Sequence, residues 1–305
     1  MKRLLRLTLF AATTLAVALS ALNFGLAWIM VMAMTQPICK NPTPVTGWPT
    51  PEEHWLPTAD GIEIRVWYYP SQNGAAVLAF GGMGGALGER LPPAAFLLEA
   101  GYGIVQVDTR ACARPSAPVT QGHDELYDAE AALDFLLTRP EVDPGKIGAI
   151  GFSMGGATAL RLAAQRAEVQ GVVRDGGFAN LGALLTPAEN DNLAIRAHKN
   201  TMLLLYRLQT GINPWDISPV DDLDVIAPRP VLLIYGEHEA AEGVRQIQHA
   251  GENTRLWVVP GGSHGRNHLA APVQYRQQVL DFFAEALQKV SAHIPRLKRG
   301  EIALA

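Results

Sequence analysis

The feature that most constrains the fold is a five-residue run, G-F-S-M-G over 151–155, which joins an apolar strand to a helix. The strand before it, KIGAIGF (146–152), is almost wholly apolar, and the segment after it, GGATALRLAAQ, favours a helix. A turn this tight leaves no room for side chains at the flanking glycines and holds Ser153 in a strained backbone that exposes its hydroxyl. A strand that runs directly into a helix is typical of a mostly parallel sheet covered by helices.

Strands and helices alternate along the rest of the chain. Apolar runs predict strands at 62–69, 75–80, 103–108, 146–152, 171–175, 230–236 and 255–260. Helical patterns lie at 91–101, 124–140 and 274–290. This alternation predicts an α/β fold with helices on both faces of the sheet, in one domain over residues 53–290.

The amino-terminal segment, residues 1–36, carries three basic and no acidic residues. No charge occurs from Leu7 to Met34, about 28 residues, whereas a bilayer needs about 20 and the apolar part of a signal peptide about 7 to 15. The length favours an uncleaved transmembrane helix. The positive-inside bias then places the amino terminus in the cytoplasm and the catalytic domain outside. Cleavage near Ala27 or Ala33 and secretion of the remainder is the alternative.

Residues 37–52 contain five prolines and predict an extended linker, and residues 291–305 are expected to form a carboxyl-terminal tail.

The two cysteines, Cys39 and Cys112, either pair in an oxidising compartment or stay as free thiols, and their spacing fits no zinc site. Acidic residues outnumber basic ones 29 to 25, and three of the basic ones precede the apolar run. Because of the cysteine spacing we expect no metal, and because of the acidic balance we expect no nucleic-acid partner.

A serine hydroxyl is a weak nucleophile that needs a general base, and the base needs an acid to orient it. Candidates for both follow strands, in the chain order serine, acid, histidine. Glu239 lies just after the strand at 230–236, and His264 lies in a glycine-rich loop after the strand at 255–260. Open parallel sheets place their sites at these strand ends. We predict Ser153 as nucleophile, Glu239 as acid and His264 as base.

Other residues compete for two of these roles. His268 is the alternative base, four residues after His264. Glu237 and Glu242 are alternatives for the acid, whereas His238 is expected to face solvent.

A tetrahedral intermediate also needs donors for its oxyanion. The backbone N–H of Met154, at the start of the helix, is one candidate. The loop G-G-M-G-G (81–85) follows a strand, and we select the N–H of Met83 as the second donor, with Gly82 as the alternative. This loop lacks the lysine and hydroxyl residue of a P-loop, so no nucleotide or other cofactor is expected.

Together these motifs resemble the α/β-hydrolase fold family over about residues 55–288. The matching segments are TADGIEIRVWYYP, GGMGG, GFSMGG, the run ending PVLLIYGEHE, and VVPGGSHG. The resemblance assigns the nucleophile to Ser153, the acid to Glu239 and the base to His264. It is strongest to a bacterial branch that includes membrane-anchored hydrolases and serine aminopeptidase-like proteins.

The chain departs from the family pattern at three points. Phe80-Gly81 stands where members usually have His-Gly, the acid is glutamate instead of aspartate, and R-A-C-A (110–113) replaces Arg-Gly-x-Gly.

The resemblance still implies a carboxylesterase-type serine hydrolase that acts on small or lipid-like esters or thioesters through an acyl-enzyme. Two alternatives stay open, a peptidase and a non-catalytic binding protein. A peptidase would capture a peptide amino terminus with an acid, for which we consider Glu189, Asp191 and Glu242.

An insertion at about 179–215 is rich in aliphatic residues. It either forms a small helical cap that covers the site and accepts an acyl chain, or packs a helix on the core.

Overall fold

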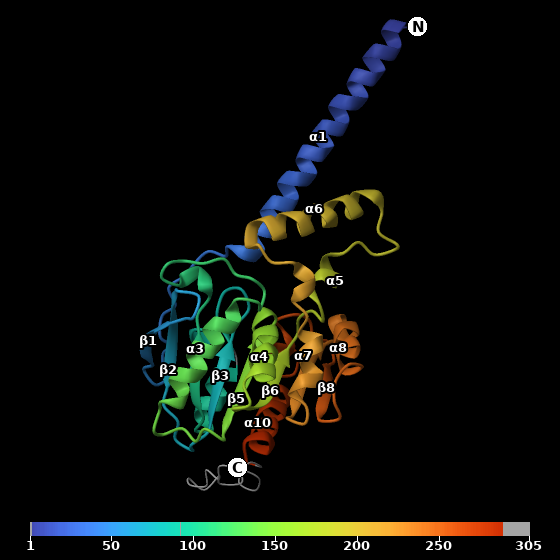
Figure 1. Ribbon diagram of the computed structural model, residues 1–305. Helices are drawn as coiled ribbons and strands as arrows, with labels where there is room; N and C mark the ends of the chain where they lie inside the picture. The colour runs from blue at the N-terminus through green and yellow to red at the C-terminus, as the bar shows by residue number, and fades with distance from the viewer. Residues whose placement is uncertain (1, 92, 289–305) are drawn as a thin grey trace, which may run out of the picture.

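An eight-stranded sheet forms the centre of the protein (Figure 1). The structure, a computed structural model, describes residues 2–91 and 93–288, so the predicted tail at 291–305 lies outside the described residues. The strands are β1 (Glu52–Pro57), β2 (Glu63–Tyr69), β3 (Ala76–Phe80), β4 (Gly103–Val107), β5 (Ile147–Phe152), β6 (Val169–Asp175), β7 (Val231–Gly236) and β8 (Thr254–Val259).

The sheet order is β1-β2-β4-β3-β5-β6-β7-β8, and β2 pairs antiparallel with both β1 and β4. Every other pairing is parallel, which confirms the mostly parallel sheet. All seven predicted strands are present to within two residues at each end. The edge strand β1 was not predicted.

Helices cover both faces of the sheet, as predicted (Figure 1). The α-helices of the described residues, including those that do not pack on the sheet, are α1 (Lys2–Thr35), α2 (Pro93–Glu99), α3 (Glu125–Leu137), α4 (Met154–Gln165), α5 (Leu181–Leu185), α6 (Leu193–Thr210), α7 (Pro219–Ile226), α8 (Ala240–Ile247), α9 (Asn267–Ala270) and α10 (Pro272–Gln288). Side chains of α3, α4 and α7 build the apolar core on one face of the sheet, and those of α2 and α10 build the core on the other. Because the sheet is buried on both faces, its central strands are apolar throughout.

Helix α1 leaves the domain as a long rod (Figure 1). Its most apolar 18-residue stretch has a mean hydropathy of 2.0, which makes it long and apolar enough to cross a membrane. Residues 3–22 are exposed along their whole length, whereas Ala27, Val31 and Thr35 are fully buried. The helix therefore has a free part and a part that packs on the domain.

The packed part of α1 belongs to a third apolar core, which we call the anchor cluster. It joins residues of α1, α4, α5 and α6 with two others, namely Ala27, Val31, Ala157, Phe178, Leu181, Leu185, Met202, Leu205, Tyr206 and Ile217. The end of α1 is also held by the following loop, because the Val119 N–H donates to the Thr35 carbonyl. The side chain of Gln121 donates to the carbonyl of Met34.

The insertion predicted at 179–215 contains α5 and α6. Helix α6 begins at a capping residue, Asn192, whose side chain accepts from the Ile195 N–H, and it ends at Gly211 with φ of 74°. One face of α6 packs into the anchor cluster, and Tyr206 Oη donates to the Thr120 carbonyl at 3.0 Å. The insertion thus packs a helix on the core, the second of the two expectations, while several of its leucines stay exposed.

The linker is tied to the domain by a disulfide. Cys39 pairs with Cys112, at the end of the 3₁₀ turn Arg110–Cys112, across 73 residues of sequence. Of the two alternatives for these cysteines, the structure has the paired one.

Candidate active site

The turn between β5 and α4 has the strained geometry expected for it. Ser153 has φ of 54° and ψ of −116°, outside the conformations that most residues adopt. A Cβ atom at Gly151 would lie 2.0 Å from the carbonyl oxygen of Gly155. A Cβ at Gly155 would lie 2.3 Å from the carbonyl oxygen of Phe80 on β3. Both flanking glycines are therefore required by close backbone contacts, and not only by the turn itself.

Three candidate side chains meet at the carboxyl ends of β5, β7 and β8. His264 Nε2 lies 3.0 Å from Ser153 Oγ, and His264 Nδ1 lies 2.8 Å from Glu239 Oε2. With Nδ1 donating to the carboxylate, Nε2 is left as an acceptor for the serine hydroxyl. The ring of Phe152 packs against that of His264, with ring centroids 4.9 Å apart. The residues are thus arranged as a nucleophile, a base and an orienting acid.

The other acids considered from the sequence are engaged elsewhere. Glu237 Oε2 accepts from the backbone N–H of Gly261 at 2.9 Å. Glu242 Oε2 accepts from the Ala179 N–H at 3.2 Å, and its second oxygen pairs with Arg245. Neither of these hydrogen bonds involves the imidazole of His264.

The alternative histidines also differ from His264 in their surroundings. His268 packs against the ring of Tyr275, and burial lowers the pKa of its imidazole. His238 is exposed on the 3₁₀ turn Glu237–Glu239, as expected.

The hydrogen bond that His264 donates to Glu239 shifts the pKa of the imidazole. It favours the imidazolium and raises the pKa of His264 above its ordinary value of 6.5, against the opposing effect of burial. The His264 side chain is 49% exposed, so the insertion does not cover it.

Sequence reasoning missed a buried carboxyl group beside this arrangement. Asp175, the last residue of β6, accepts from Asn267 Nδ2 at 2.7 Å and from Tyr275 Oη at 2.8 Å. Burial raises the pKa of Asp175 to about 6, against the effect of these two hydrogen bonds. The available signal was an acidic residue ending an apolar strand at the same edge of the sheet as Ser153.

The two glycines after Asp175 were missed as well. Gly176 has φ of 68°, and a Cβ there would lie 3.0 Å from Glu239 Oε1 and 3.1 Å from His264 Nδ1. A Cβ at Gly177 would lie 3.0 Å from the Ser153 carbonyl oxygen. The available signal was the pair of glycines directly after a strand.

The two candidate oxyanion donors lie on different elements. Met154 is the first residue of α4, and Met83 lies in a tight turn in which the Gly85 N–H donates to the Gly82 carbonyl at 2.9 Å. Gly82 and Met154 border one small cavity of about 20 Å³, whereas Met83 is exposed. Both Met83 and Gly82 remain candidates for the second donor.

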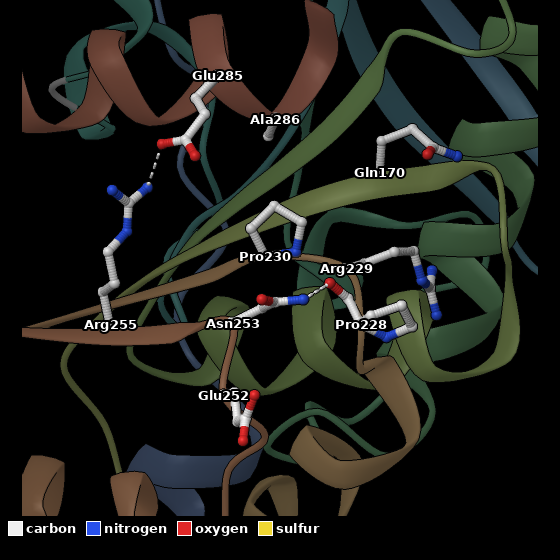
Figure 2. A pocket seen from close by; sticks show the side chains of 9 residues that line it. All are labelled: Gln170, Pro228, Arg229, Pro230, Glu252, Asn253, Arg255, Glu285 and Ala286. Atoms are coloured by element: carbon white, nitrogen blue, oxygen red, sulfur yellow. Dashed lines mark hydrogen bonds and ion pairs between the residues drawn. The ribbon is translucent and has the colours of Figure 1, made fainter. Parts of the chain in front are cut away.

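A larger cavity, of about 410 Å³, lies at the amino ends of β7 and β8, whereas the candidate side chains lie at the carboxyl ends. Figure 2 shows the residues that line it. Arg255 and Glu285 form an ion pair at 3.2 Å across it, and Asn253 donates to the Pro228 carbonyl. Arg229 donates to carbonyl oxygens near the end of α4. None of the candidate catalytic residues lines this cavity. Among residues 2–91 and 93–288, no group of three or more His, Cys, Asp and Glu side chains could hold a metal ion.

Comparison with known proteins gives similar sequences and similar folds. The model of the dienelactone hydrolase family matches residues 109–206. The uncharacterized protein Rv2307c of Mycobacterium tuberculosis is 31% identical over 217 residues, which cover 68% of this chain and 70% of that protein. Cutinase est1 of Thermobifida alba is 30% identical over 129 residues, which cover 38% of this chain and 40% of that protein. The solved structure of the Pyrococcus furiosus esterase Pf2001 superposes with a TM-score of 0.61 at 22% identity, covering 82% of this chain and 98% of that one.

Proposed function

The chain belongs to the α/β-hydrolase fold family, and from that premise we propose that it cleaves carboxylic esters or thioesters through an acyl-enzyme on Ser153. The observation that carries the proposal is the hydrogen-bonded series from Ser153 Oγ through His264 to Glu239, at 3.0 and 2.8 Å. An ester substrate is supported by the names of the relatives, which include a dienelactone hydrolase family, an esterase and a cutinase.

The reaction follows from the geometry of these groups. His264 Nε2 takes the proton of Ser153 as the hydroxyl oxygen attacks the carbonyl carbon, and Glu239 stabilises the imidazolium that forms. The backbone N–H of Met154 and that of Met83 or Gly82 stabilise the oxyanion. The imidazolium then gives its proton to the departing alcohol or thiol, and a water activated by His264 releases the acid from the acyl-enzyme.

A peptidase is the second candidate, and it receives less support. Of the three acids considered for capture of a peptide amino terminus, Glu242 binds the Ala179 N–H and Arg245, and Asp191 binds Lys199 and the Ala188 N–H. Glu189 is exposed and makes no ion pair with the described residues, so it is the acid left for this role. Faster cleavage of an aminoacyl amide than of the matched ester would favour the peptidase.

We further propose that α1 is retained as a membrane anchor and that the catalytic domain lies outside the cytoplasm. Cleavage after Ala27 would remove Ala27 from the anchor cluster, and cleavage after Ala33 would remove both Ala27 and Val31, which are fully buried. The basic residues before the apolar run favour a cytoplasmic amino terminus. The Cys39–Cys112 disulfide is consistent with an oxidising compartment.

The test uses the full chain, purified in detergent, with a fluorophosphonate probe and p-nitrophenyl esters of increasing acyl length. We expect the probe to label Ser153, and Ser153→Ala to abolish labelling and to lower ester hydrolysis by a factor on the order of 10⁴ or more. Ser116→Ala, at an exposed serine in a loop, is the control and should retain both. Absence of labelling in the folded protein would favour the non-catalytic alternative.

A further inference from the structure

The outer side of α6 carries three large apolar side chains, which we call the α6 face. They are Leu193, Leu204 and Leu208, which are 83%, 58% and 72% exposed. Leu204 follows Leu193 by 11 residues, and Leu208 follows it by 15. Because each residue turns an α-helix by about 100°, all three side chains lie within an arc of about 60°. Exposed apolar groups gathered on one helical face indicate a surface that contacts a partner.

The charges of α6 narrow the choice of partner. The helix sequence LAIRAHKNTMLLLYRLQT contains Arg196, Lys199 and Arg207 and no acidic residue. Lys199 pairs with Asp191 just before the helix, whereas Arg196 and Arg207 are exposed. Arg207 also lines, together with Leu204 and Leu208, an open groove of about 560 Å³ along the helix. A helix with apolar and basic groups on its accessible surface has the composition of helices that lie in the surface of a bilayer with anionic headgroups.

The contact with α1 sets the height of α6 relative to a membrane. Counted from Leu7, the first residue after the charged ones, about 20 residues cross the hydrocarbon core, which brings the chain to about Leu26. The α6 helix contacts α1 at this level. Asn23 Nδ2 donates to Thr201 Oγ1 at 2.9 Å, and Asn23 Oδ1 lies 3.1 Å from His198 Nδ1.

The arrangement of the elements agrees with this count. Helix α6 crosses α1 where α1 reaches the domain, so it lies between the free part of α1 and the sheet (Figure 1). A bilayer that holds the free part of α1 is therefore on the α6 side of the domain.

We propose that the α6 face rests on the bilayer from which α1 emerges, with the leucines in the interface and Arg207 at the headgroup phosphates. This proposal rests on the proposed anchoring by α1. The anchor cluster joins Ala27 and Val31 of α1 to Ala157, four residues after Ser153. The catalytic edge of the sheet thus lies on the membrane side, and the substrate class is an amphiphilic ester that resides in the bilayer.

The test measures the depth of nitroxide labels on the full chain in phosphatidylcholine and phosphatidylglycerol vesicles. Because the two native cysteines are paired, a single added cysteine can be labelled. The labelled variants are Leu208→Cys on the α6 face, Val225→Cys as control, and Ala12→Cys within the free part of α1. Val225 is 60% exposed on α7, which matches the exposure of Leu204 and Leu208.

Collision with oxygen, which concentrates in lipid, is compared with collision with a water-soluble nickel complex. We expect the oxygen-to-nickel ratio at residue 208 to exceed that at residue 225 by about fivefold, because the label enters the interface. Equal ratios at 208 and 225 with a lipid-exposed label at residue 12 would overturn the α6 proposal alone. An aqueous label at residue 12 would overturn the anchor as well.

A second copy of the chain is the competing occupant of the α6 face. Spectral broadening at residue 208 that unlabelled protein removes, together with a low oxygen ratio, would assign the face to that copy and overturn the proposal. Ester hydrolysis by the same samples reports on Ser153 separately, so failure of the catalytic proposal is recognised independently.

Discussion

Gly176 illustrates how single residues position the site, because its missing side chain leaves space for Glu239 and His264. We expect Gly176→Ala to lower kcat/KM for p-nitrophenyl esters by about tenfold or more, since displacement of the base by a fraction of an ångström disturbs the reacting geometry. The left-handed φ also costs about 1–2 kcal/mol with a Cβ present.

Gly61→Ala is the matched control for this prediction. Gly61 also has a left-handed φ, of 89°, but a Cβ there meets nothing within 4 Å. Urea unfolding should show a similar loss of stability in both variants, whereas kcat/KM should fall in Gly176→Ala only. Equal kcat/KM values in the two variants would contradict the role of Gly176.

In the proposed mechanism the pH dependence of hydrolysis is set by His264, which must be neutral to accept the serine proton. Because Glu239 raises the pKa of His264 above 6.5, kcat/KM should be full at higher pH and should fall as the pH drops through that raised pKa. Glu239→Gln removes the carboxylate charge, so the acid limb should move to lower pH. Its kcat should fall by a factor on the order of 10³, because the histidine loses its orienting acceptor.

Glu237→Gln is the control for the pH profile, since Glu237 accepts from the Gly261 N–H and makes no contact with the base. Its acid limb should coincide with that of the wild type. A Glu239→Gln profile with the same limb as the wild type would mean that another acid orients His264.

Single residues also mark where sequence reasoning on the site ended. Ser153, Glu239 and His264 could be selected because each lies in a short motif next to a recognisable strand end. Asp175 and Gly176 could not, because their importance comes from contacts with Asn267 and His264, about 90 residues away in the chain. Such contacts depend on the packing of whole elements and leave no local pattern.

Among the elements, the parallel strands were predictable because burial on both faces makes each of them a continuous apolar run. The strand β1 has the mixed sequence EEHWLP, lies at the edge of the sheet and pairs only with β2. It therefore lacks that pattern. The apolar length of α1 was also predictable, but its division into a free and a packed part was not, because both parts are equally apolar.

This division gives a prediction about truncated chains. A chain that starts at Asn23 keeps Ala27 and Val31 in the anchor cluster, whereas one that starts at Pro37 loses them. We expect the shorter chain to have a free energy of unfolding lower by at least about 2 kcal/mol, from the lost burial of Val31 and its neighbours. Urea unfolding of the two proteins in mild detergent measures the difference.

A chain that starts at Asn23 with Val31→Ala is an intermediate case and should lie between the two. Equal stability of the two truncated chains would mean that the packed part of α1 contributes nothing to the domain, and would remove the argument against signal cleavage.

Across the whole molecule, the Cys39–Cys112 disulfide fixes the segment that follows α1 to the α/β domain. It closes a loop with a sequence separation of 73 residues, for which the chain-entropy model gives a stabilisation of about 4 kcal/mol. We expect a Cys39→Ala, Cys112→Ala double variant to lose stability of that order. Denaturant unfolding with and without reductant measures it, and reductant should affect only the wild type.

Helix α1 runs without a break from Lys2 to Thr35, and one face of its last turns packs on the domain. There is consequently no hinge between the part suited to a membrane and the part that holds Ser153. An anchored molecule of this build would carry its reactive serine at one fixed height and would meet substrates by lateral diffusion. Its rate would then follow the number of substrate molecules per unit area of membrane, and adding inert lipid would slow it as dilution slows a reaction in solution.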